Sequence, residues 1–143
     1  MKTFFTIQMG KWRVPKALGY RFVDTTVKSG ELLFAPTWDL LGRYKSGEIG
    51  NHGYTLEYYS LINTRLKNSR NAFESLFVPD TPVALACFCG ARSFCHRRLL
   101  ASVLVDECDG QYEGELISEE EVVQFEHDQF LSYSQWKEDY LNK

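Results

Sequence analysis

The sequence predicts an α/β fold, a single domain in which a mostly parallel sheet lies between two layers of helices in a Rossmann-like, three-layer arrangement. Three observations support this prediction. The chain has 143 residues, the size of one domain. Its composition, 44% hydrophobic and 24% charged, is typical of a globular protein and excludes a disordered or fibrous chain. Segments with strand character alternate with segments of helical spacing.

Four segments have the composition of β-strands. Residues 4–8 and 20–26 are short runs rich in aromatic and β-branched side chains. Residues 83–89 are apolar at the positions that would face either side of a strand, which suits a central parallel strand covered by helices on both faces. Residues 112–117 follow as the last predicted strand.

Helices are predicted between these strands. Pro36 and Thr37 mark a helix start with Thr37 as the N-cap, and Gly47 and Gly50 mark its end. Ser93 is placed to cap a later helix. The remaining predictions, from apolar spacing and glycine content, are a turn at 51–53 and helices over 54–66, 73–77 and 94–107.

Charge divides the chain into two parts. Residues 1–105 hold 14 Lys and Arg against 7 Asp and Glu, whereas residues 106–143 hold 2 against 12. A basic body suits an anionic ligand such as a nucleotide or nucleic acid. Ser118 to Glu121 form a capping-box pattern ahead of Val122. We therefore divide the chain into an α/β domain over 1–117 and an acidic helical extension over 118–143 that packs on it.

The sequence also favours a cytoplasmic protein with reduced thiols and no membrane partner. No apolar run reaches the roughly 20 residues of a membrane span, and the first residues lack the pattern of a signal peptide. Cys87, Cys89 and Cys95 fall within nine residues, and Cys108 follows. Such clustering is unlike the spread cysteines of a disulfide-stapled secreted domain.

The segment from Cys87 to Arg98 carries the most chemistry. It is predicted to run from a strand through a loop containing Gly90 into a helix N-terminus. A helix start directs backbone N–H groups and a positive dipole end at one point, and Arg92 and Arg97 add charge. We expect residues 89–97 to bind an anion, most naturally a phosphate group.

Cys95 is the predicted reactive thiolate of this segment, because a helix N-terminus and arginines lower a thiol pKa. His96 beside it suits an acid or base role, and plain packing of both remains an alternative. A cysteine phosphatase is disfavoured, since no arginine follows any of these cysteines at the required spacing. Zinc is disfavoured, since structural zinc sites usually draw their ligands from two Cys-x₂₋₄-Cys pairs far apart in the sequence. We expect neither a metal nor a cofactor.

The segment CFCGARSFCHRRLL, with VDTTVKSG and FAPTWDLL upstream, resembles the DUF488-like family, in the form carried by small phage and bacterial members. The resemblance covers roughly residues 4–117. It implies an α/β fold and places the site at the Cys-His-Arg segment. It implies no particular reaction.

These observations predict a pocket for a nucleotide or a phosphorylated nucleoside. Whether the chain acts on such a ligand stays open, as do a non-catalytic, phage-encoded accessory that sequesters nucleotides and a nucleic-acid binder. The predicted catalytic residues are Asp24, Cys95 and His96. The predicted ligand-binding residues are Thr25, Thr26, Lys28, Tyr54, Tyr58, Cys89, Gly90, Arg92 and Arg97, with Trp38 as a further stacking surface.

Overall fold

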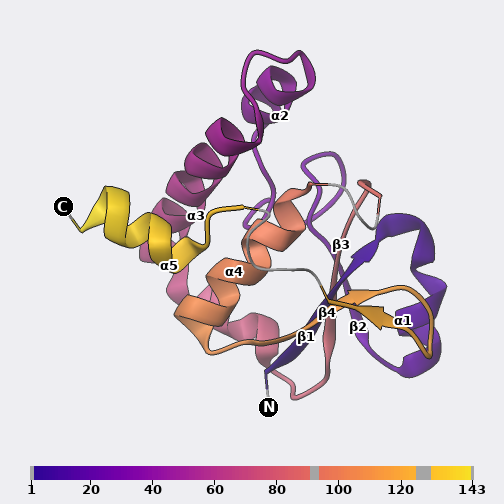
Figure 1. The fold of residues 1–143 in the computed structure, drawn as a ribbon. Coiled ribbons are helices and arrows are strands. Elements are labelled where there is room, and N and C mark those ends of the chain that lie inside the picture. Colours follow the sequence, from indigo (N-terminus) through magenta and orange to yellow (C-terminus); the bar gives the residue numbers. More distant parts are fainter. Residues whose placement is uncertain (1, 91–93, 125–129, 143) are drawn as a thin grey trace.

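The computed structural model describes residues 2–90, 94–124 and 130–142 (Figure 1). One five-stranded sheet has the order β2-β3-β1-β4-β5, in which the first four strands are parallel and β5 runs antiparallel to β4. The α/β fold with a mostly parallel sheet is thus confirmed. The strands are β1 (Thr3–Gln8), β2 (Arg21–Asp24), β3 (Val83–Cys87), β4 (Gln111–Leu116) and β5 (Val122–Val123).

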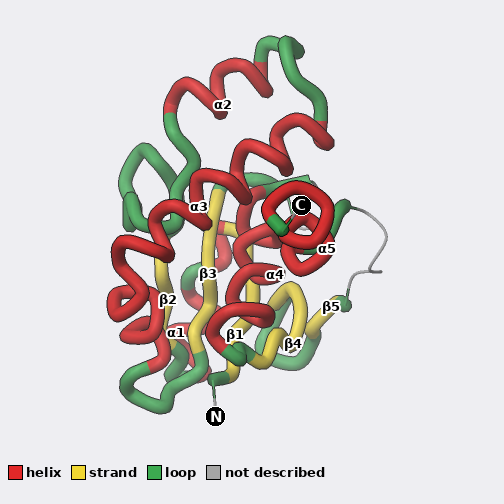
Figure 2. The backbone as a smooth tube through the Cα atoms, turned by 90° about the vertical axis from the view of Figure 1, so that its left-hand side faces the viewer, coloured by secondary structure: helices red, strands yellow, loops and turns green. Residues whose placement is uncertain are grey.

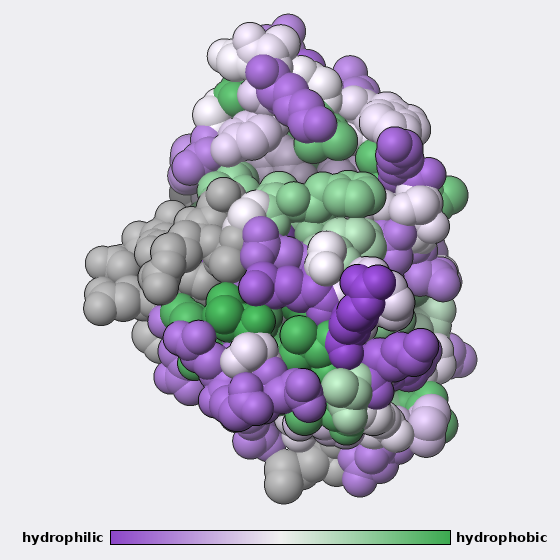
Figure 3. Space-filling model, turned by 90° about the vertical axis from the view of Figure 1, so that its right-hand side faces the viewer, coloured by the Kyte–Doolittle hydropathy of each residue, from purple (hydrophilic) through white to green (hydrophobic). Residues whose placement is uncertain are grey.

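Helices cover both faces of the sheet, and each face buries its own set of apolar side chains. The short helix α1 (Arg13–Leu18), which the sequence analysis did not predict, packs on the face that carries Phe5 and Ile7. The longer helices α3 (Asn51–Glu74) and α4 (His96–Cys108) pack on the opposite face (Figure 2). On the side of the molecule that carries α1, hydrophobic side chains interrupt the hydrophilic surface (Figure 3).

The region around α2 (Trp38–Lys45) shows one prediction confirmed and one wrong. Thr37 caps the helix, because its Oγ1 accepts a hydrogen bond from the backbone N of Leu40 at 3.1 Å. The turn predicted at 51–53 is instead the first turn of α3. The two predicted helices then merge into α3, with a break in helical geometry at Ser69, followed by a 3₁₀ turn at Ser75–Phe77.

The C-terminal segment differs from the predicted extension at its start. Residues 118–121 form the turn between β4 and β5, so the capping-box pattern does not begin a helix. Val122 instead pairs with Leu116, as suits a β-branched residue. Later, α5 (Tyr133–Trp136) and a π-helical turn (Lys137–Leu141) are helical. Tyr133 and Trp136 are buried against Tyr59 of α3, so this part packs on the same body.

Within the described ranges, no helix has both the length and the apolar character needed to cross a bilayer.

Candidate functional site

Two loops leave the sheet at the carboxyl ends of neighbouring parallel strands. Asp24 ends β2 and lies opposite Ala86 of β3 in the strand register. The backbone N of Thr25 donates to the Ala86 carbonyl oxygen at 2.9 Å, which carries the pairing one residue further. The loop after β3 leads into α4, whose first residue is His96. In open α/β sheets, ligands bind at this edge.

The loop after β2 is organised by the Asp24 carboxylate. Its Oδ1 accepts hydrogen bonds from the backbone N and the hydroxyl of Thr26, at 2.8 and 2.7 Å, and its Oδ2 accepts one from the Ser29 hydroxyl at 2.5 Å. Burial favours a higher pKa for Asp24, but the hydrogen bonds from Ser29 and Thr26 outweigh it and hold the pKa below its usual value. Asp24 therefore serves as an ionised loop organiser. Lys28, in the same loop, is exposed.

His96 connects the two loops. Its Nε2 lies 2.9 Å from the Thr25 carbonyl oxygen and 3.0 Å from the Thr25 hydroxyl, which itself donates to the Ala86 carbonyl. Because a carbonyl only accepts, the proton is assigned to Nε2, which leaves Nδ1 as an acceptor 3.8 Å from Cys95 Sγ. Burial lowers the pKa of His96 to about 4, so the ring is neutral at pH 7.

The cysteines depart from the predictions in two ways. Cys87 and Cys95 are joined in a disulfide, so the prediction of four reduced cysteines and a free Cys95 thiolate is wrong for this structure. Cys95 is the N-cap of α4 rather than a residue of its first turn, and it is buried. The backbone at Cys95 is extended rather than helical.

The second departure concerns Cys89. The strand ends at Cys87, so Cys89 lies in the loop that follows β3. The Sγ atoms of Cys87, Cys89 and Cys95 all lie within 4.8 Å of one another. Cys89 is a free thiol and is half-buried. Burial raises its pKa, while the positive charges of Arg97 and Lys45 act in the opposite direction.

Arg97 is wholly buried, and its guanidinium donates only to protein atoms in the described structure. Nε and Nη2 form a two-pronged pair with the buried carboxylate of Glu115 in β4, at 3.1 and 2.8 Å. Nη1 donates to Cys87 Sγ at 2.8 Å and to the Cys89 carbonyl at 3.1 Å, and Nη2 donates to the Gly90 carbonyl at 2.9 Å. This arrangement makes Arg97 the anchor of the loop after β3. A direct ligand contact for Arg97 stays a prediction.

Glu115 is the site residue that sequence reasoning missed. The available indication was an acidic side chain at a position of the predicted strand 112–117 that is followed directly by the apolar Leu116 and Ile117. A buried carboxylate needs a partner, but the sequence does not show which cation the fold places beside it.

The predicted stacking residues divide into buried and open ones. The Tyr58 hydroxyl donates to the Phe34 carbonyl at 2.7 Å, and the ring is fully buried 5.7 Å from the His96 ring. The Tyr54 ring packs edge-on against Phe94, with 5.6 Å between centroids, and Tyr44 contacts both rings. Tyr44 and Phe94 are half-buried. Trp38 is 61% exposed. Arg92 lies outside the described residues.

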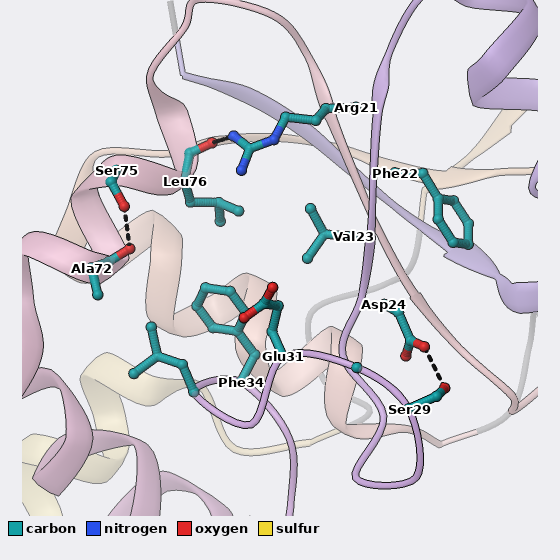
Figure 4. Close-up of a pocket in the computed structure, with 12 residues that line it drawn as sticks. Arg21, Phe22, Val23, Asp24, Ser29, Glu31, Phe34, Ala72, Ser75 and Leu76 are labelled. Atoms are coloured by element: carbon teal, nitrogen blue, oxygen red, sulfur yellow. Dashed lines mark hydrogen bonds between the residues drawn. The ribbon is translucent and has the colours of Figure 1, made fainter.

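A cleft of about 500 Å³ opens beside the loop after β2. Figure 4 shows Val23, Glu31, Phe34 and Leu76 around it, with Asp24 hydrogen-bonded to Ser29 at one side. At the upper rim, Arg21 Nη1 donates to the Leu76 carbonyl at 2.7 Å. The cleft therefore adjoins the predicted site, since Asp24 and Ser29 are among the residues that line it.

Comparison with known proteins identifies the family. A family model described as "Active DUF488-N3 subclade" matches residues 11–107, more than half of the chain. The match includes both loops and all three clustered cysteines, and it ends before β4. No curated protein and no solved structure matches the chain. The chain belongs to the DUF488-N3a family, as the resemblance of its Cys-His-Arg segment indicated.

Proposed function

We propose that this member of the DUF488-N3a family binds a nucleotide or phosphorylated nucleoside, with the phosphate group at the N-terminus of α4. The observation that carries the proposal is the start of this helix. Cys95 is the N-cap but makes no side-chain capping hydrogen bond, so its side chain leaves the first N–H groups of this 13-residue helix uncapped. A phosphate oxygen satisfies such groups and gains from the helix dipole.

Aromatic side chains beside this helix supply a surface for the base. Phe94 directly precedes the N-cap, and the half-buried rings of Phe94 and Tyr44 lie 5.7 Å apart. Stacking of a nucleobase on an aromatic ring contributes about 1–3 kcal/mol without selecting a particular base. Phe94 is the aromatic residue that lies nearest in the sequence to the start of α4. We therefore expect the base of a mononucleotide bound there to stack on Phe94.

The arrangement supports binding more strongly than catalysis. The carboxylate of Asp24 accepts three internal hydrogen bonds, and the Nε2 proton of His96 is directed to Thr25. Both predicted acid–base groups thus hold the loops together. A nucleic-acid binder would need an extended basic surface, and its affinity would fall steeply as the salt concentration rises.

One observation favours an enzyme as the second candidate. The Nδ1 acceptor of His96 lies 3.8 Å from Cys95 Sγ, and a cysteine paired with a histidine is a common arrangement of an activated thiol nucleophile. This candidate requires reduction of the disulfide. Turnover of a nucleotide only after reduction, and its loss in Cys95→Ser, would support it.

Amide chemical shifts test the binding proposal. We expect the backbone amides of His96 and Arg97 to shift on titration with adenosine monophosphate and with inorganic phosphate, and not with adenosine. The first amides of α3 are a matched control, because Gly50 caps that helix without a side-chain hydrogen bond as well. Equal shifts at both helices would indicate nonspecific anion binding, and an absence of shifts at α4 would refute the proposal.

A pair of aromatic substitutions tests the place of the base. Phe94→Ala is expected to weaken nucleotide binding roughly tenfold, in line with the lower part of the stacking range. Trp38→Ala removes an exposed aromatic ring of α2 and is expected to leave the affinity unchanged. An equal loss in both variants would contradict stacking on Phe94.

A further inference from the structure

Three sulfur atoms gather where β3 ends and α4 begins. Cys87 is the last residue of β3, Cys89 lies in the following loop, and Cys95 is the N-cap of α4. Their Sγ atoms lie within 4.8 Å of one another. The disulfide accounts for two of them and leaves the third thiol unexplained. Of the four cysteines, Cys108 stands apart, buried at the other end of α4.

We propose that, in the reduced protein, Cys87, Cys89 and Cys95 together bind one thiophilic divalent metal ion such as zinc, with a fourth coordination position open. A dithiol reductant supplies two electrons and two protons to the disulfide, which becomes two thiols while the dithiol is oxidised. Binding of the metal then releases the three thiol protons to solvent. This inference goes beyond nucleotide binding and does not depend on it.

The backbone spacing fits a bridging ion better than a direct bond. The Cα atoms of Cys87 and Cys95 are 7.8 Å apart, wider than the roughly 4.4–6.8 Å that most disulfides span. Thiolates bound to one zinc ion at about 2.3 Å stand about 3.8 Å from each other in tetrahedral geometry. Three sulfurs already within 4.8 Å reach that arrangement by small side-chain rotations.

Neighbouring groups provide the hydrogen bonds that support a metal-bound thiolate. Arg97 Nη1 donates to Cys87 Sγ at 2.8 Å, and Arg97 is itself held by Glu115. Such surrounding hydrogen bonds orient ligands and commonly affect metal affinity 10–100-fold.

The number of ligands indicates the kind of site. In the part of the chain that the structure describes, the sulfur cluster has three members, whereas closed structural zinc sites use four protein ligands. Three protein ligands with an open fourth position are the pattern of zinc sites that accept water or another oxygen ligand. Cys89 is only half-buried, which gives that position access from the surface.

Metal titration of the full chain under anaerobic, reducing conditions tests the proposal. We expect about one zinc or cobalt ion per chain to remain after gel filtration, and cobalt to give thiolate-to-metal absorption. Cys89→Ser is expected to lower zinc affinity roughly 100-fold or more, since a ligand should matter at least as much as its surroundings. Cys108→Ser is the matched control and is expected to keep the wild-type affinity. Circular dichroism of both variants checks that they fold.

Three results would overturn the proposal. In the first, the folded, reduced wild-type chain retains no metal. In the second, Cys89→Ser binds the metal as tightly as wild type, and in the third, Cys108→Ser loses as much metal affinity as Cys89→Ser. His96→Ala should retain the metal, and loss in that folded variant would show a fourth protein ligand and contradict the open position. The nucleotide proposal is tested separately, by the amide shifts of the oxidised, metal-free chain. Either proposal can therefore fail without affecting the other.

Discussion

The loop after β2 and the loop after β3 leave the same edge of the sheet but are held in different ways. In the first, Asp24, Thr26 and Ser29 form a network of neighbours in sequence, and the Ser29 end of it is exposed. In the second, the anchor is Arg97, which is fully buried and paired with Glu115 on another strand. The first network needs only that one loop adopts its conformation. The Arg97–Glu115 pair forms only when α4 packs against β4 in the folded sheet. Mutations in the two loops should therefore differ greatly in effect.

Breaking the Arg97–Glu115 pair should have the largest effect. Arg97→Met leaves the Glu115 carboxylate buried without its partner, and we expect the free energy of unfolding to fall by about 3–5 kcal/mol. Urea denaturation measures this loss. Arg43→Met is the matched control, because Arg43 makes a two-pronged pair with Glu57 on the surface and its loss should be small.

The double variant Arg97→Met with Glu115→Leu sharpens this test. Replacing both partners by apolar side chains removes the unpaired charge and should restore much of the lost stability. A double variant no more stable than Arg97→Met, or an equal loss in Arg43→Met, would show that the buried pair is not the anchor of the second loop.

The same contrast explains what could be predicted from the sequence. The apolar run of β3 and the Thr37 cap were predictable, because periodicity and capping are local properties. The polar residues after β2 were also recognised at a strand end. By contrast, the Arg97–Glu115 pair depends on which strands become neighbours. The sulfur cluster depends on how the start of α4 places Cys95 beside Cys87 and Cys89, and that placement is a property of the fold rather than of local composition.

Local patterns also misled where tertiary pairing decided the outcome. Ser118 to Glu121 satisfy a capping box, yet Val122 and Val123 pair with β4 and make the pattern a hairpin turn. Arg97 showed a similar ambiguity: its position near a helix start suggested a ligand contact, and only the fold shows that its donors turn inward.

A glycine in the loop after β2 gives a test of intermediate size. A Cβ atom at Gly30 would overlap the Asp24 carbonyl oxygen and Oδ1, so Gly30→Ala forces backbone and carboxylate apart. We expect a loss of about 1–3 kcal/mol in the free energy of unfolding. Gly42→Ala is the control, because no atom lies within 4 Å of its added Cβ and alanine favours a helix by about 0.5–1 kcal/mol. A Gly30→Ala variant as stable as wild type would mean that the first loop rearranges freely.

The smallest expected effect is the pH dependence of the Asp24 network. The pKa of Asp24 is lower in the folded chain than its ordinary value of 3.8, so the folded state holds fewer protons than the unfolded state around that pH. The stability that the carboxylate contributes is therefore present above pH 3.8 and is lost as the pH falls through the folded pKa.

Asp24→Asn cannot accept the Ser29 hydrogen bond at its amide nitrogen and should be slightly less stable than wild type at pH 6.5. Urea denaturation from pH 6.5 downward should show this difference shrinking once the pH falls below 3.8 toward the folded pKa. Ser29→Ala should reproduce it and add little in the double variant, because the two side chains share one hydrogen bond. A difference that stays constant over the whole pH range would show that Asp24 acts through packing, and the contrast between an electrostatic local loop and a buried long-range one would no longer hold.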